Sequence, residues 1–175
     1  MDITNILGAL TGNDAVDAIA KNLKIDSKQV SSVITSALPS LLGAMQKNAS
    51  TQGGAEALTK ALGDHAGNAG NILSNLSGAD LTDGNKILSH IFGGNLSSVI
   101  SGISKKSGVA NNSVSSILAA IAPSLLALLG KGQQNSGTNA AGLAGMLGTI
   151  LMASQAQKSG GHGGLLGGLG KIFGT

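Results

Sequence analysis

Several residue types are missing from this chain of 175 residues. It contains no cysteine, tryptophan, tyrosine or arginine, and every one of its 11 basic side chains is a lysine. Without cysteine the chain has no disulfide framework, zinc–thiolate site, iron–sulfur cluster or thiol nucleophile. Charged residues make up 11% of the sequence, against about 25% in ordinary domains. The sequence is instead rich in small and aliphatic residues, with 28 glycines and an apolar fraction of 42%.

Aromatic residues are limited to Phe92 and Phe173, so any core must be built from Leu, Ile, Val, Ala and Met. Such a core suits close helix packing better than sheets, which are enriched in aromatic and β-branched residues. Alternation with a period of two residues never persists, and no Asn-Gly or Asp-Gly pair joins two β-rich runs. The sequence therefore predicts an all-α fold.

The two halves of the chain resemble each other when the sequence is shifted by 84 positions. Residues 30–42 then lie over residues 114–126, with seven of thirteen positions identical. The only two prolines, Pro39 and Pro123, coincide in this comparison. We expect an internally duplicated helical domain whose two halves pack pseudo-symmetrically.

Weaker matches extend the duplication toward the C-terminus. They join residues 55–63 to 140–148 and residues 86–93 to 167–174. The expected division is a first helical repeat at 1–93, a second repeat packed on it at 94–157, and a Gly/Leu-rich tail at 158–175 that is the degenerate end of the second repeat.

The longest apolar pattern predicts a helix that contains Pro39. Asp26 is an N-cap candidate followed three residues later by Gln29. Apolar residues then recur on one helix face, at Val30, Val33, Ile34, Ala37, Leu38, Leu41, Leu42 and Met45. Pro39 either kinks this helix or opens a second one at its first turn. Because Pro123 occupies the matching position, we favour a kinked helix in both halves.

Other helices and the breaks between them follow from the same periodicity and from glycine. Helices are expected at 14–23, 53–62, 84–92, 96–107 and 140–153. Breaks are expected at 12–13, 63–70, 77–78, 93–94 and 130–137.

Four parts of the sequence carry a family resemblance: ITSALPSLLG at 34–43, residues 54–62, ILSHIFGG at 87–94 and the Leu/Gly tail. Together they resemble the DUF937 family of uncharacterised bacterial proteins (YidB-related). The resemblance implies an all-helical fold, with a homeodomain-like motif described for a relative, and no established biochemical activity. The second half departs from this pattern, because the position of His90 is taken by Lys171. Any role of His90 is therefore not duplicated.

A homeodomain-like motif raises the possibility of nucleic-acid binding, for which Lys21, Lys24 and Lys28 form a basic stripe at spacings of three and four. Lysines neutralise phosphates and give a salt-dependent, non-specific affinity. Specific base contacts and single-strand binding rely on arginine and on aromatic platforms, which this chain lacks. We favour the interpretation that these lysines are the solvated face of a helix, and keep nucleic-acid binding as an alternative function.

The histidines are candidates for metal binding or acid–base chemistry, together with nearby aspartates. They are His65, His90 and His162, with Asp64, Asp80 and Asp83 as neighbours. Asp64 and His65 are expected in a glycine-rich loop, and His90 is interpreted as a helix C-terminal residue. No HExxH, GxSxG or phosphate-loop motif is present. We expect no catalytic residues, no metal site and no cofactor.

The tail carries the most suggestive local pattern. If it is helical, one face is apolar, formed by Leu165, Leu166, Leu169, Ile172 and Phe173. Glycine costs about 1 kcal/mol in a helix interior, so this helix should form only when docked on its own domain, on another subunit or on a membrane surface. A second face of small residues, at Ala141, Ala144, Gly145 and Gly148, also permits close helix approach.

These observations predict a non-enzymatic structural or interaction protein that self-associates through small-residue helix faces and the tail. Its partners are further copies of itself or another protein, with no small-molecule substrate evident; membrane-surface association through the tail is a second alternative. The N-terminus has no lysine before Lys21 and lacks a secretory pattern. The apolar stretch 114–129 is shorter than the about 20 residues that cross a bilayer. We therefore expect a buried helix there and a cytoplasmic protein.

Overall fold

The computed structural model describes residues 8–158, which form helices joined by short turns, without a strand among them. The predicted all-α class is thus confirmed. The elements in chain order are α2 (Asn13–Leu23), α3 (Ser27–Ala49), α4 (Gln52–Ala66), η1 (Gly67–Asn71), α5 (Ile72–Ser77), α6 (Leu81–Phe92), η2 (Gly93–Asn95), α7 (Leu96–Ser107), α8 (Asn111–Ser136) and α9 (Ala140–Lys158). A single hydrophobic cluster takes side chains from every α-helix of this part of the chain.

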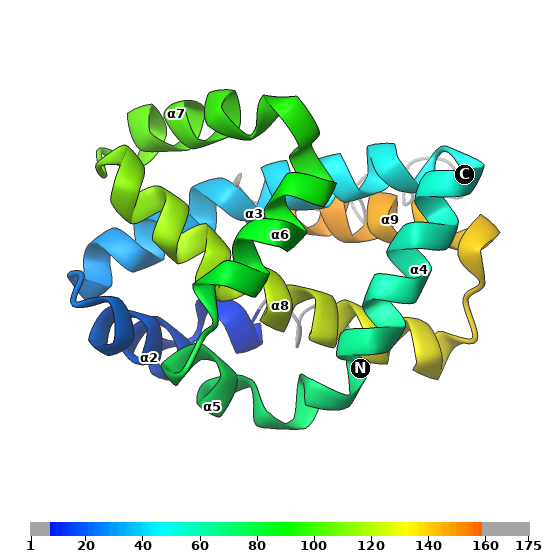
Figure 1. Cartoon of the computed structure of the whole chain (residues 1–175), viewed down its shortest axis with the longest axis horizontal. Helices are drawn as coiled ribbons and strands as arrows, with labels where there is room; N and C mark the ends of the chain where they lie inside the picture. Colours follow the sequence, from blue (N-terminus) through cyan, green and yellow to red (C-terminus); the bar gives the residue numbers. More distant parts are fainter. Residues whose placement is uncertain (1–7, 159–175) are drawn as a thin grey trace, which may run out of the picture.

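Helix α8 lies at the centre of this cluster. Every residue from Ile117 to Gly130 is buried except Pro123. Helices α4 and α6 both pack on α8, and Figure 1 shows them lying across it. Among the described residues α8 is the one helix long and apolar enough to span a membrane, and 78% of its most apolar window is buried inside the protein. This burial confirms the prediction of a core helix for residues 114–129.

Helix α3 has a corresponding set of neighbours on the other side of the molecule. It packs against α9, beside which it lies in Figure 1, and against α7. Its inward face is fully buried at Val30, Val33, Ile34, Leu41 and Met45. Burying one such side chain stabilises the fold by about 1.5–3 kcal/mol, so the predicted apolar face is also the face that holds α3 in place.

Both prolines lie inside continuous helices, Pro39 in α3 and Pro123 in α8. The prediction of one helix through each proline is therefore confirmed. Proline has no N–H, so the carbonyl four residues earlier loses its helical donor. In α8 this carbonyl belongs to Ala119, and Gly84 of α6 packs so closely on it that a Cβ at Gly84 would overlap the carbonyl group.

Two of the predicted glycine breaks, 63–70 and 130–137, contain a helix end but start too early. Helix α4 continues through Gly63 to Ala66, and α8 continues through Gly130 to Ser136. Gly130 is buried where α4 crosses α8, and a Cβ there would overlap the Leu62 carbonyl. The helix persists because close packing outweighs the about 1 kcal/mol that glycine costs in a helix interior.

Candidate functional site

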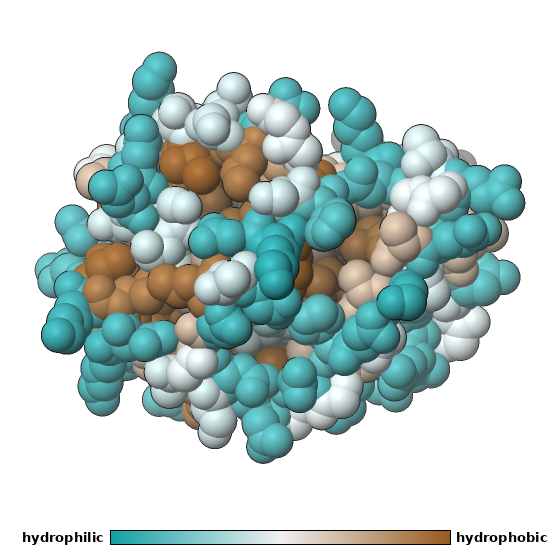
Figure 2. Space-filling model, viewed as in Figure 1, coloured by the Kyte–Doolittle hydropathy of each residue, from teal (hydrophilic) through white to brown (hydrophobic). Residues whose placement is uncertain are grey.

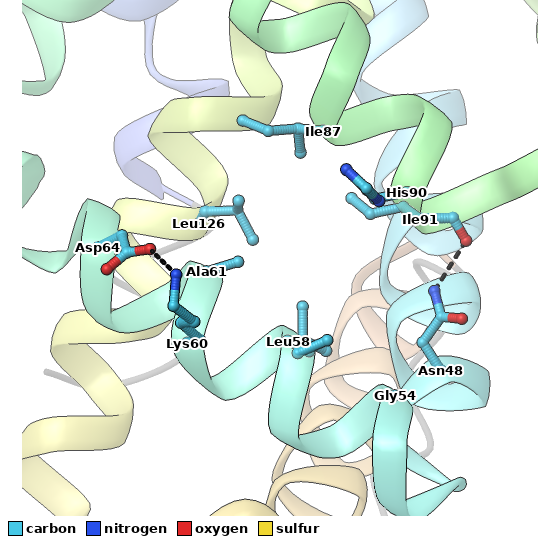
Figure 3. Close-up of a pocket in the computed structure, with 11 residues that line it drawn as sticks. Asn48, Gly54, Leu58, Lys60, Ala61, Asp64, Ile87, His90, Ile91 and Leu126 are labelled. Atoms are coloured by element: carbon cyan, nitrogen blue, oxygen red, sulfur yellow. Dashed lines mark hydrogen bonds and ion pairs between the residues drawn. The ribbon is translucent and has the colours of Figure 1, made fainter.

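An apolar groove of about 330 Å³ opens between α4 and α6, with α8 as its floor. Its apolar lining comes from three helices that are far apart in the sequence, and consists of Ala57, Leu58, Ala61, Ile87, Ile91 and Leu126. Figure 3 shows Leu58, Ile87 and Leu126 projecting into this space from the three sides. Figure 2 shows the corresponding apolar surface between α6 and α4, surrounded by polar side chains.

The polar groups of the groove lie around its apolar centre. Asn48 Nδ2 donates a hydrogen bond of 2.8 Å to the Ile91 carbonyl, which ties α3 to the end of α6 (Figure 3). Lys60 Nζ and Asp64 Oδ2 form an ion pair at 3.5 Å, with both side chains mostly exposed. Such exposed pairs contribute little to stability, but this one neutralises the charge beside the groove. Its volume and apolar lining suit the binding of apolar side chains or an amphipathic helix.

A second, more polar pocket of about 240 Å³ lies where α4, α5 and α6 meet α8. It contains His65, whose Nδ1 lies 2.8 Å from the Ala61 carbonyl and whose Nε2 lies 3.4 Å from Asp83 Oδ2. Both neighbours are acceptors, so both contacts are hydrogen bonds only when both ring nitrogens carry a proton. This geometry joins α4 to the start of α6.

The prediction that Asp64 and His65 lie in a glycine-rich loop is wrong, because both belong to the last turns of α4. They continue the helix since Leu62 and Ala66 of the same segment are buried. Of the candidate cluster, His65 and Asp83 meet, whereas Asp64 and His90 line the other groove. Within residues 8–158 no three His, Cys, Asp or Glu side chains are grouped so that they could hold a metal ion.

Asp80 caps the N-terminus of α6 beside this pocket. The backbone amides of Asp83 and Thr82 donate to its Oδ1 at 3.3 and 2.8 Å. These two hydrogen bonds hold the pKa of the Asp80 carboxyl below its ordinary value of 3.8. They favour the charged form, because each N–H donates to the carboxylate.

The substitution Asp80→Asn tests this cap, because asparagine keeps the acceptor oxygen and cannot ionise. A lowered folded pKa gives stability that is present above the unfolded pKa and is lost as the pH falls through the folded pKa. We expect the stability difference between wild type and variant to be constant near neutral pH and to shrink in acid. Urea unfolding at several pH values measures it. A difference that does not change with pH would contradict the role of the charge.

The three lysines of the predicted basic stripe lie around the turn between two helices. Lys21 is in the last turn of α2, Lys24 ends this helix with φ of 56°, and Lys28 is in the first turn of α3. All three are exposed. Since the turn separates them, they do not form a stripe on one helix. Their contact with nucleic acid stays a prediction.

In the predicted small-residue face of α9, Ala141 and Gly145 are exposed, and Ala144 and Gly148 are half-buried. Leu143, Leu147 and Ile150 are buried, and Gly148 lies against the Gln46 side chain of α3. The outward side consists of Ala141, Gly142, Gly145, Thr149 and Met152. The tail residues Leu165, Leu166, Leu169, Ile172 and Phe173 lie outside the described residues, as does His162.

The sequence did not predict the groove, since its lining comes from separate helices whose mutual placement no local pattern encodes. The helical spacing of Leu58 and Ala61 and of Ile87 and Ile91 was the available signal. It indicates apolar faces on α4 and α6 without showing that they leave a space over Leu126.

Together these features define an all-helical protein with an apolar groove on a weakly charged surface. The chain belongs to the DUF937 family of bacterial proteins of unknown function, whose family model matches residues 5–133. Comparisons with curated proteins and with solved structures gave no match. The matched range ends inside α8, so α9 follows it in the sequence.

Proposed function

We propose that the protein is a non-enzymatic interaction protein that associates with further copies of itself. The observation that carries this proposal is the outward side of α9. It has no charged residue between Ala141 and Met152, and Met152 is 76% exposed. Gly145 lies on the same side with open space around it. Small residues let a second helix approach closely, and a weakly charged surface reduces the repulsion between copies.

The groove between α4 and α6 supports binding rather than catalysis. Its polar groups are the Lys60–Asp64 pair, the exposed His90 and the Asn48 amide, which donates to Ile91. The described residues that line the groove include no serine, threonine or cysteine that could act as a nucleophile. An apolar helix of another copy fits the chemistry of this surface better than a small polar substrate does.

We also infer that the chain arose by duplication of a unit of about 84 residues. Helix α3 begins at Ser27 and α8 at Asn111, which is a separation of 84, and each contains one proline. Helices α2 and α7 precede them in the same way. The packing supports the inference: α3 pairs with α9 and α4 pairs with α8, so exchanging the halves reproduces the same pairings.

Self-association through α9 is tested by the substitution Met152→Glu. The matched control is Leu73→Glu, because Leu73 on α5 is the other exposed large apolar residue of the described chain, at 48%. We expect Met152→Glu to raise the dissociation constant at least about tenfold, or about 1.4 kcal/mol, because it places a charge in the contact. Leu73→Glu should leave it unchanged.

Light scattering over a range of protein concentrations measures the association. The expected wild-type result is a molar mass that rises with concentration. A wild-type protein that stays monomeric at high concentration rules out the self-association proposal. Equal weakening by both substitutions rules out α9 as the contact.

A further inference from the structure

We propose that the C-terminal segment 165–173 docks on the outer face of α3 in its own chain. Its position on α3 would correspond to the position of α6 on α8. The proposal rests on the duplication inferred above and is independent of self-association. Four observations lead to it: an open face on α3, a carbonyl freed by Pro39, the sequence of the segment and the course of α9 along α3.

The first observation is a difference in burial between two equivalent helix faces. On α8 the residues beneath and beside α6 are buried, including Ala119 and Ala120. The residues 84 positions earlier on α3 are Thr35, which is exposed, and Ser36, which is half-buried. The same contrast appears one turn later, where Ser124 is buried and Ser40 is half-buried. Hence α3 has an open face where its counterpart is covered.

The second observation concerns the carbonyl groups that the prolines leave without a helical donor. In α8, Pro123 frees the Ala119 carbonyl, and the backbone of Gly84 in α6 covers it. A Cα–H group in such close contact gives the carbonyl a weak hydrogen bond. In α3, Pro39 frees the Thr35 carbonyl in the same way. Thr35 is exposed, and we infer that its carbonyl is accessible to a second glycine-containing helix.

The third observation is the sequence of the segment. Leu169, Ile172 and Phe173 repeat the spacing of Leu88, Ile91 and Phe92 in α6. All three residues of α6 are buried. In this register Leu165 takes the place of Gly84, but Gly168 takes the place of the buried Ile87 on the same face and permits a close approach about one turn later.

The fourth observation is the course of α9 along α3. Gly148 lies against Gln46, and Leu151 lies near Gly43, so the two helices run antiparallel. Seven further residues at 1.5 Å each bring Lys158, the last described residue of α9, to the level of Ser36. The six residues 159–164 can span up to about 20 Å. The segment can therefore reach the open face, and a tether this short gives its own α3 a large concentration advantage over a second copy.

The test uses the absence of native cysteine. Three full-length double variants each carry Lys171→Cys, at the position that corresponds to the exposed His90 of α6. The second cysteine is at Thr35 on the open face of α3, at Ala57 in the α4–α6 groove, or at Ser74 on α5. All three second sites are exposed. A short bis-maleimide cross-linker is applied to dilute, monomeric protein, and the products are separated by denaturing electrophoresis.

We expect the Thr35→Cys pair to cross-link within one chain at least tenfold faster than the Ser74→Cys pair, and we expect Ile172→Asp to remove this advantage. Equal rates for the Thr35 and Ser74 pairs overturn the proposal. Fastest reaction of the Ala57→Cys pair assigns the segment to the groove and also overturns it.

A mixture of the two single variants, Thr35→Cys and Lys171→Cys, distinguishes a second copy as the source of the segment. Cross-linked dimers that form as fast as the intramolecular product overturn docking within one chain. The cross-linking uses dilute monomer, whereas light scattering uses concentrated protein. A protein that does not self-associate can therefore still give the expected cross-link. A protein that does not give the cross-link can still self-associate.

Discussion

Replacing Gly84 by alanine lowers the free energy of unfolding by about 3 kcal/mol, at the upper end of what overpacking a core costs. The added Cβ overlaps the Ala119 carbonyl in the middle of α8. This obstacle is backbone in a buried helix, so relief requires α6 to move away from α8. Urea unfolding followed by circular dichroism measures the loss.

The control for this substitution is Gly102→Ala. Gly102 lies inside α7, and nothing lies within 4 Å of the position of a new Cβ. The helix propensity of alanine should raise stability there by up to about 1 kcal/mol. If both variants shift stability in the same direction, close contact at Gly84 does not determine the result.

Replacing Gly130 by alanine is expected to have an effect of similar size at the crossing of α4 and α8. The new Cβ overlaps the Leu62 carbonyl and lies 3.1 Å from the Ala66 Cβ. Because α4 is displaced, the loss of about 3 kcal/mol should be accompanied by changes in the groove lining at Leu58 and Ala61. Urea unfolding gives the free energy, and NMR shifts of the Leu58 and Ala61 methyl groups report the movement.

Gly63→Ala is the matched control for this crossing, since Gly63 is in the interior of α4 and has open space at the Cβ position. It should stabilise the protein by up to about 1 kcal/mol and leave the methyl shifts of the groove unchanged. A stable Gly130→Ala variant with unshifted methyl groups would contradict the proposed contact.

These two glycines show where sequence reasoning succeeded and where it failed. Periodicity predicted α7 at its observed bounds and predicted both proline-containing helices. It interpreted Gly130 as part of a break, because helix propensity is a local property. Whether a glycine ends a helix or admits a neighbouring backbone depends on the partner helix, and Leu62 is 68 positions away from Gly130 in the sequence.

The candidate site was less predictable than the fold for the same reason. The groove depends on how α4 and α6 are spaced over Leu126, and the contact between His65 and Asp83 joins residues 18 apart. The sequence indicated both residues as candidates but placed His65 in a loop. Burial of Leu62 and Ala66 extends the helix through that position, and such burial is a tertiary effect.

The pairing of α3 with α9 and of α4 with α8 has a consequence for synthesis on the ribosome. When only residues 1–93 have emerged, Leu62 and Leu88 lack α8, the surface on which α4 and α6 pack. Long-range pairing of this kind delays folding until the later segment is available. The apolar faces of α4 and α6 therefore stay exposed until α8 has been synthesised, and the chain then folds as one unit.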